Sequence, residues 1–136
     1  MLRAVRFTAM LGFTVDPETL TAIRRQAPAI RRISAERIRE ELNRILTSGG
    51  AREGMELLTE SGLLKEILPE VLALRGVSQP PAFHPEVDVW EHTLRMLALL
   101  PREDGGADLR LAWAVVLHDI GKAVTRSENA TGTHFY

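Results

Sequence analysis

Residues 109–122 read LRLAWAVVLHDIGK, an apolar run that closes on a His-Asp pair. On a helix, its apolar residues fall on nearly every side, which predicts a helix that is buried on most sides. Gly121 stands where the C-cap residue of such a helix would lie. A charged pair in an apolar setting is costly unless it is compensated, and imidazole beside carboxylate suits a divalent cation. His118 and Asp119 therefore predict a metal site, with a plain capping role at the helix end as the alternative.

A second helix is expected just before this run. Asp88-Val-Trp-Glu91 has the spacing of a capping box, in which Asp88 accepts from the first turn and Glu91 reaches back to the cap amide. The box predicts a helix over 89–100, which Pro101 stops. His92 falls in the first turns of this helix, so the two helices are expected to bring it towards the His-Asp pair. Histidine and carboxylate together suit Mg, Mn, Ni, Co, Fe or Zn.

Helices are also expected throughout the amino-terminal half, and no segment alternates for long enough to predict a strand. Cap and breaker residues set their limits. The expected segments are 2–11, stopped by Gly12; a helix begun by Asp16-Pro17 that runs to about Ala27, where Pro28 interrupts; a helix capped by Ser34 and broken by Gly49-Gly50; 51–60; and a short apolar run over 63–68. The sequence thus predicts an all-α fold.

Turn-forming residues divide the chain into two parts. Residues 75–82, RGVSQPPA, are too rich in glycine, serine and proline for a helix. They predict a linker between an amino-terminal domain over 1–74 and a carboxy-terminal domain over 83–136. A loop is expected over 102–107, where Gly105-Gly106 would join the two later helices.

Composition points to the cytoplasm. The chain has 136 residues, 45% of them hydrophobic, which is enough for one or two small helical domains with a real core. It contains no cysteine, which excludes disulfides and a thiolate zinc site. No apolar run approaches the ~20 residues of a membrane span, and no signal peptide is apparent. We therefore expect a cytoplasmic protein with no membrane partner.

The net charge of −1 conceals a basic amino-terminal part. Residues 1–44 hold nine arginines against five acidic residues, whereas the rest holds eight basic and thirteen acidic residues. Arginine suits bidentate contact with phosphate, so this part is a candidate surface for an RNA backbone. The alternative is a solvated helix face that Glu36, Glu40 and Glu41 partly neutralise. The candidate arginines are Arg24, Arg25, Arg31, Arg32, Arg37 and Arg39.

The carboxy-terminal motifs resemble the HD superfamily of metal-dependent phosphohydrolases. The segments 83–86 (FHPE), 88–92 (DVWEH) and 117–122 (LHDIGK) look like the HD domain that is fused to bacterial tRNA nucleotidyltransferases and poly(A) polymerases. The resemblance implies that His92, His118 and Asp119 are metal ligands and that Asp119 takes part in catalysis. It also implies that Lys122 contacts a substrate phosphate; the alternative is a solvated lysine near a helix end. The implied reaction is hydrolysis of phosphoesters such as 2′,3′-cyclic or 2′-phosphates.

The amino-terminal motifs resemble the neck and RNA-binding region of the same nucleotidyltransferase family. They are 2–7 (LRAVRF), 11–19 (LGFTVDPET) and 34–42 (SAERIREEL), in the order that the family has them. The resemblance implies an RNA-binding neck over 1–74, with Arg3 and Arg6 on a helix next to the base-recognition motif. The implied partners are tRNA or another RNA 3′ end and a nucleotide or phosphoester substrate.

The same resemblance implies a fragment. The family carries its nucleotidyl-transfer carboxylates on an amino-terminal sheet domain, and this chain has no Gly-Ser loop followed by Asp-x-Asp. In the family, the remaining HD ligands lie beyond the segment that matches 133–136. We therefore expect a truncated HD domain and a chain that does not transfer nucleotides by itself. The rivals are a stand-alone HD phosphohydrolase and a non-catalytic RNA-binding module. The sequence does not indicate an oligomeric state.

Overall fold

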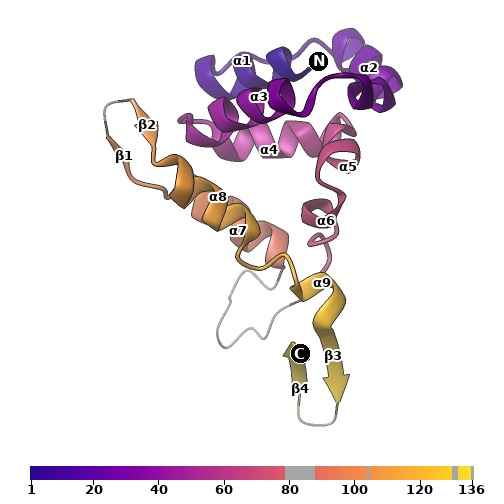
Figure 1. The fold of residues 1–136 in the computed structure, drawn as a ribbon, viewed down its shortest axis with the longest axis vertical. Coiled ribbons are helices and arrows are strands. Elements are labelled where there is room, and N and C mark those ends of the chain that lie inside the picture. The colour runs from indigo at the N-terminus through magenta and orange to yellow at the C-terminus, as the bar shows by residue number, and fades with distance from the viewer. Residues whose placement is uncertain (79–87, 104, 130–131, 136) are drawn as a thin grey trace.

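Helices make up most of the part of the chain that the structure describes. The computed structural model describes residues 1–78, 88–103, 105–129 and 132–135. Figure 1 shows the amino-terminal helices stacked at one end, the later helices running away from them, and a hairpin near the carboxyl terminus at the opposite end. The predicted all-α class is confirmed, although two short hairpins that were not predicted accompany the helices.

Caps and breakers act at the first two helices as the sequence predicts. Helix α1 (Leu2–Leu11) ends at Gly12, which has a φ of 69° in the left-handed region that favours glycine. Helix α2 (Pro17–Gln26) begins after Asp16, whose carboxylate accepts hydrogen bonds from two backbone amides of the first turn. As predicted, α2 ends just before Pro28. The chain then continues as a 3₁₀ helix, η1 (Ala27–Arg32), and Pro28 lies in its first turn, where no amide donor is needed.

Four further helices complete the amino-terminal part. They are α3 (Ala35–Thr47), α4 (Ala51–Glu60), α5 (Leu63–Ile67) and α6 (Pro69–Leu72). Ser34 lies at the N-cap of α3, but its side chain makes no capping hydrogen bond. The pKa of the Glu36 carboxyl is lowered by a backbone hydrogen bond and, secondly, by one from Ser34. The serine thus supports the first turn through Glu36.

The carboxy-terminal part is a pair of helices with hairpins at its ends. Helices α7 (Val89–Ala98) and α8 (Leu109–Leu117) are joined by the antiparallel strands β1 (Arg102–Glu103) and β2 (Gly106–Ala107). A short helix α9 (Lys122–Thr125) leads into the antiparallel pair β3 (Arg126–Asn129) and β4 (Gly132–Phe135). Strands of two to four residues are too short to produce a readable alternation, which is why the sequence predicted a loop over 102–107 and no strand in either hairpin.

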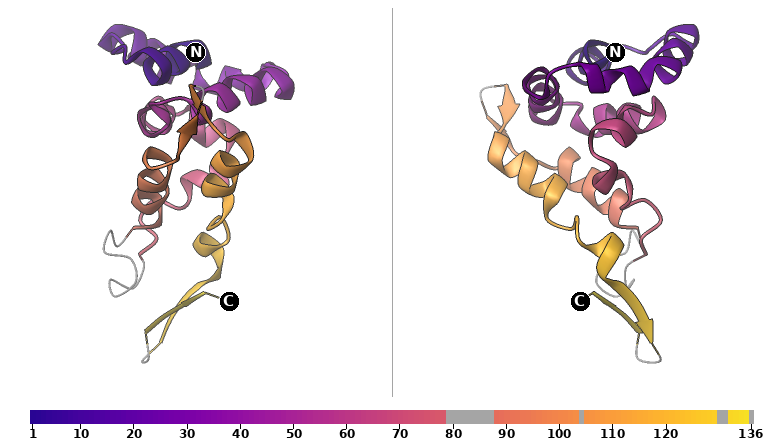
Figure 2. Two further views of the ribbon diagram at one scale, coloured as in Figure 1. Left: turned by 90° about the vertical axis from the view of Figure 1, so that its left-hand side faces the viewer. Right: turned by 45° about the vertical axis from the view of Figure 1, so that its right-hand side comes forward.

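The buried core continues from the amino-terminal helices into α7 and α8. Helix α7 packs on α4, and helix α8 packs on α3. Figure 2 shows α7 and α8 as two distinct helices below the amino-terminal stack. The Trp113 indole donates to the Asn43 side chain at 2.8 Å, which ties α8 to α3. The predicted boundary at 75–82 stays a prediction, and residues 79–82 lie outside the described part. Within the described ranges, no helix is long and apolar enough to cross a membrane.

Helix α8 is less buried than its sequence predicts. Leu109, Leu111 and Leu117 are 40%, 41% and 40% exposed, because among the described elements the helix packs mainly against α3 and α7. Gly121 is not a left-handed C-cap either. Its φ is −73°, and it precedes α9, while His118 occupies the C-cap position of α8.

Candidate functional site

The two later helices bring His92, His118 and Asp119 together. His92 lies near the start of α7, whereas the His-Asp pair follows the last residue of α8. Because a tight hairpin joins the helices, the start of one lies beside the end of the other. One potential ligand atom from each residue lies within 4.8 Å of the other two. The imidazole rings of His92 and His118 are 5.6 Å apart between centroids.

A backbone carbonyl orients the His118 ring. Its Nδ1 lies 2.8 Å from the carbonyl oxygen of Val115. Since a carbonyl oxygen only accepts, Nδ1 carries the proton in this contact, and neutral imidazole then keeps its lone pair on Nε2. Nε2 lies 3.2 Å from Oδ2 of Asp119. This is the arrangement of a metal-ligating histidine, in which the other ring nitrogen is held by a backbone carbonyl.

Asp119 is a buried carboxylate in a position to share a cation with His118. Only 9% of its surface is exposed. The Lys122 ammonium, on the first turn of α9, donates to the same Oδ2 at 2.8 Å. Two nitrogens therefore approach one carboxylate oxygen. The nitrogen and oxygen donors fit a borderline-to-hard divalent ion, so the residues present suit the group that the sequence predicts.

The capping box that positions His92 differs in one half from the prediction. Asp88 accepts from the backbone amide of Glu91 at 3.0 Å, and its second oxygen accepts from the amide of Gly76. Glu91 does not reach back to the cap. Its carboxylate pairs with both terminal nitrogens of Arg52 on α4, at 3.0 and 3.1 Å, and this contact raises the pKa of Arg52. Arg52 thus anchors the first turn of α7, a role that no local pattern in the sequence signals.

Three of the predicted RNA-binding arginines form ion pairs with glutamates. Arg6 pairs with Glu41 at 3.0 Å, and only 12% of its side chain is exposed. The other two pairs lie at the surface, at 2.7 Å each: Arg24 with Glu60, and Arg31 with Glu66. The partners on α4 and α5 are far along the chain from the arginines, so sequence spacing did not reveal them.

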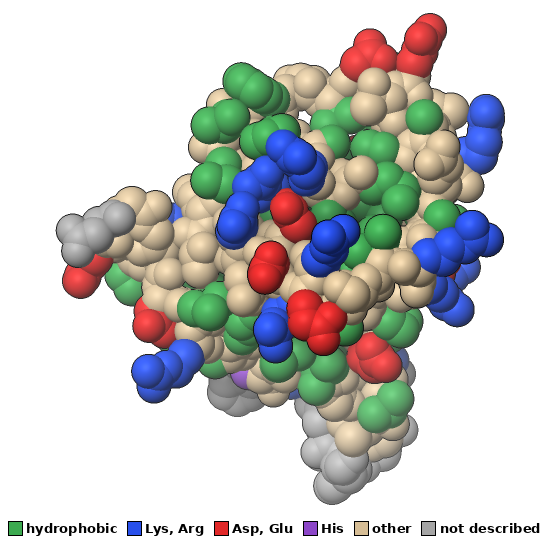
Figure 3. All heavy atoms as spheres, turned by 45° about the horizontal axis from the view of Figure 1, so that its top comes forward, with side chains coloured by type: hydrophobic (Ala, Val, Ile, Leu, Met, Phe, Trp, Pro, Cys, Tyr) green, Lys and Arg blue, Asp and Glu red, His purple; other side chains and the backbone are tan. Residues whose placement is uncertain are grey.

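The other candidate arginines lie exposed on the amino-terminal elements. They are Arg3, Arg25, Arg32, Arg37 and Arg39. Within the described part of the chain, Arg25, Arg32 and Arg37 have no ion-pair partner, whereas Arg3 lies over the ring of Phe7 and Arg39 interacts with Glu36. Figure 3 shows basic and acidic side chains interleaved with apolar ones over this end of the molecule, so the face is not uniformly basic.

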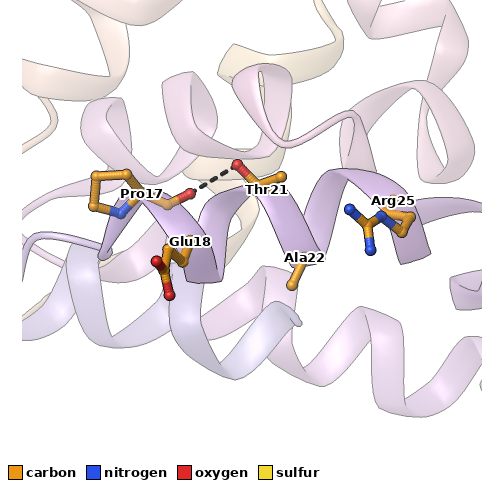
Figure 4. Close-up of a pocket in the computed structure, with 5 residues that line it drawn as sticks. All are labelled: Pro17, Glu18, Thr21, Ala22 and Arg25. Carbon is orange, nitrogen blue, oxygen red and sulfur yellow. Dashed lines mark hydrogen bonds between the residues drawn. The ribbon is translucent and has the colours of Figure 1, made fainter.

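Three of these arginines line two separate hollows. Arg25 is at one end of a shallow hollow along α2, and Figure 4 shows the Thr21 hydroxyl turned back onto the Pro17 carbonyl, at 2.9 Å. Glu18 lines the same hollow, so its charge is mixed. Arg37 and Arg3 line a second hollow between the start of α1 and α3. The arginines are therefore spread over several elements and do not converge on one pocket.

A family model matches residues 12–74 of the chain. Its description is "Probable RNA and SrmB-binding site of polymerase A". The match covers the helices from α2 to α6, including all the exposed candidate arginines except Arg3.

Curated relatives match nearly the whole chain. A multifunctional CCA protein of Alkalilimnicola ehrlichii is 42% identical over 133 residues, which cover 94% of this chain and 32% of the relative. Proteins of the same name from Halorhodospira halophila and Pseudomonas syringae pv. syringae are 41% and 39% identical over 133 and 130 residues, with 94% and 92% of this chain and 32% and 31% of the relative covered. The chain thus spans about a third of the length of these relatives. No solved structure matches it.

Proposed function

The chain belongs to the family of CCA-adding enzymes and poly(A) polymerases, and on this premise we propose that it binds the 3′ end of tRNA or a similar RNA through its amino-terminal helices. The match of residues 12–74 to a family named for RNA binding is the observation that carries this proposal. The activity of the whole protein would be addition or repair of the tRNA 3′ end. The carboxylates for nucleotidyl transfer would lie in the amino-terminal sheet domain of the family, which these residues do not match.

The arginines that lack a carboxylate partner support RNA binding most directly. An arginine that is already paired must give up its glutamate before it can hold a phosphate. Arg25, Arg32 and Arg37 need no such exchange within the described part of the chain. We therefore propose these three as the principal phosphate contacts, with Arg3 and Arg39 beside them. Arg24 and Arg31 would contribute less, and Arg6 would act in the core.

Replacing Arg25, Arg32 and Arg37 together by alanine is expected to flatten the salt dependence of tRNA binding. The slope of log Kobs against log salt is negative, and each lost phosphate contact reduces its magnitude by about 0.7–0.9. The magnitude of the slope should therefore fall by roughly two in the triple variant. Binding curves for a tRNA acceptor stem, measured at several salt concentrations, give this slope. The control removes a neutral pair, Arg24→Ala with Glu60→Ala, and should change the slope much less than the triple variant does. An unchanged slope in the triple variant would rule out these arginines as the contacts.

We also propose that His92, His118 and Asp119 hold a divalent metal ion for hydrolysis of a phosphoester. The support is the convergence of the three ligand atoms within 4.8 Å and the Val115 carbonyl that leaves Nε2 of His118 as an acceptor. The ion could be Mg, Mn, Ni, Co, Fe or Zn. Such an ion, when bound, activates water and polarises a phosphoryl oxygen.

The protein side chains have separate parts in this proposed reaction. The Val115 carbonyl accepts from Nδ1 of His118, which leaves Nε2 of the neutral ring as the nitrogen that can ligate. Asp119 supplies a carboxylate oxygen next to that nitrogen. Lys122 lies beside the site, within hydrogen-bond distance of Asp119. Its ammonium is therefore near enough to donate to a phosphate oxygen of the substrate.

One pair of assays separates the proposed functions. The RNA-binding function predicts salt-sensitive binding of tRNA by the chain in the presence of EDTA. The metal site predicts release of phosphate from a 2′,3′-cyclic nucleotide only when a divalent metal is added. Binding without hydrolysis would favour the non-catalytic RNA-binding module, whereas hydrolysis without tRNA binding would favour the HD phosphohydrolase.

A further inference from the structure

Lys122 is hydrogen-bonded to the Asp119 oxygen that lies beside Nε2 of His118. Its Nζ lies 2.8 Å from Oδ2 of Asp119, and only 21% of the lysine side chain and 11% of the aspartate side chain are exposed. The two residues face each other across one turn, in which the Lys122 amide donates to the Asp119 carbonyl at 2.9 Å. The pair is therefore held in place by the backbone and partly shielded from water, unlike a loose surface contact.

The same Oδ2 also faces His118. Nε2 of His118 lies 3.2 Å from it, so the two atoms are close enough to hold one divalent ion between them. An ammonium bonded to that oxygen would then stand beside the ion. Two cations repel strongly at such a separation in a partly buried site, so the ammonium and the ion are not expected to share Oδ2.

We infer that Lys122 is an internal competitor for the metal. Its ammonium neutralises the buried Asp119, a divalent ion must displace it from the carboxylate, and the displaced ammonium then binds a phosphate oxygen of the substrate. This inference rests on the proposed metal site. Lys122 would thus have opposite effects on two affinities: it would weaken metal binding and strengthen phosphate binding.

Mn²⁺ titration of the full chain tests the first step. Lys122→Gln is expected to bind Mn²⁺ about fivefold more tightly than the wild type, because an ion pair of this kind contributes about 1 kcal/mol or a fivefold change. Lys122→Arg keeps a paired cation and should stay close to the wild type. Lys65, the only other lysine in the chain, is exposed on α5, so Lys65→Gln is the matched control for the lost charge. Lys122→Met serves as a second neutral variant if Lys122→Gln does not fold.

Titration of the Mn²⁺-loaded protein with inorganic phosphate tests the second step. Lys122→Gln should bind phosphate about tenfold more weakly, as expected for loss of one charge-assisted hydrogen bond. Tighter Mn²⁺ binding combined with weaker phosphate binding supports the inference. If the wild type binds Mn²⁺ and Lys122→Gln binds it equally or more weakly, the competitor role is wrong while the metal site stands. If neither binds Mn²⁺, the proposed metal site itself fails, and the inference fails with it.

Discussion

Asp119→Asn is expected to weaken Mn²⁺ binding by more than about 100-fold and to abolish metal-dependent phosphate release. Loss of a group that merely orients a metal ligand costs about 10- to 100-fold, and Asp119 is proposed as a ligand itself. The amide keeps the shape of the carboxylate but removes its charge, so the change tests the chemistry with little change in packing. Mn²⁺ titration and a phosphate-release assay measure the two effects. His118→Ala should behave in the same way.

The matched control for this change lies at the other end of helix α8. Asp108 is the N-cap of α8, and its carboxylate accepts from the Leu111 amide at 2.9 Å. Asparagine caps helices as well as aspartate does, so Asp108→Asn should keep the fold, the metal affinity and the activity. Phosphate release that survives Asp119→Asn, or falls equally in both variants, would overturn the assignment of Asp119.

Gly50→Ala is expected to lower the free energy of unfolding by about 2–4 kcal/mol. A Cβ at this position would overlap the carbonyl oxygen of Ala9 on α1, which is backbone and has no rotamer through which to move aside. The Gly50 amide also donates to that oxygen at 3.0 Å, so the start of α4 is held directly against α1. Separating the two helices would weaken this hydrogen bond and loosen the packing that supports the arginine-bearing elements. Urea unfolding followed by circular dichroism measures the loss.

The neighbouring glycine provides the control for this prediction. A Cβ at Gly49 would meet nothing within 4 Å, so Gly49→Ala should change the stability by no more than about 0.5 kcal/mol. Equal stabilities for the two alanine variants would contradict the close approach of α4 to α1. The same comparison in the tRNA-binding assay would show how far the arginine surface depends on this contact.

Local patterns predicted most of the helix boundaries. Gly12 ends α1, and the Asp16-Pro17 and Asp88 caps begin α2 and α7, because each of these effects involves groups within four residues along the chain. The prediction for Gly121 was wrong for a local reason as well. Gly121 starts a new short helix where the sequence predicted only the end of the old one.

By itself, the sequence determined the helical class, most of the caps, the basic amino-terminal part and the identity of the three proposed ligands. The tertiary structure alone decided how these residues are used. It placed His92 within reach of His118 and Asp119, turned Nδ1 of His118 onto a carbonyl, and paired some arginines with glutamates while leaving others open. Caps and periodicity depend on groups a few bonds apart, whereas these contacts join atoms from different helices. Their geometry therefore exists only once the core has packed α7 on α4 and α8 on α3.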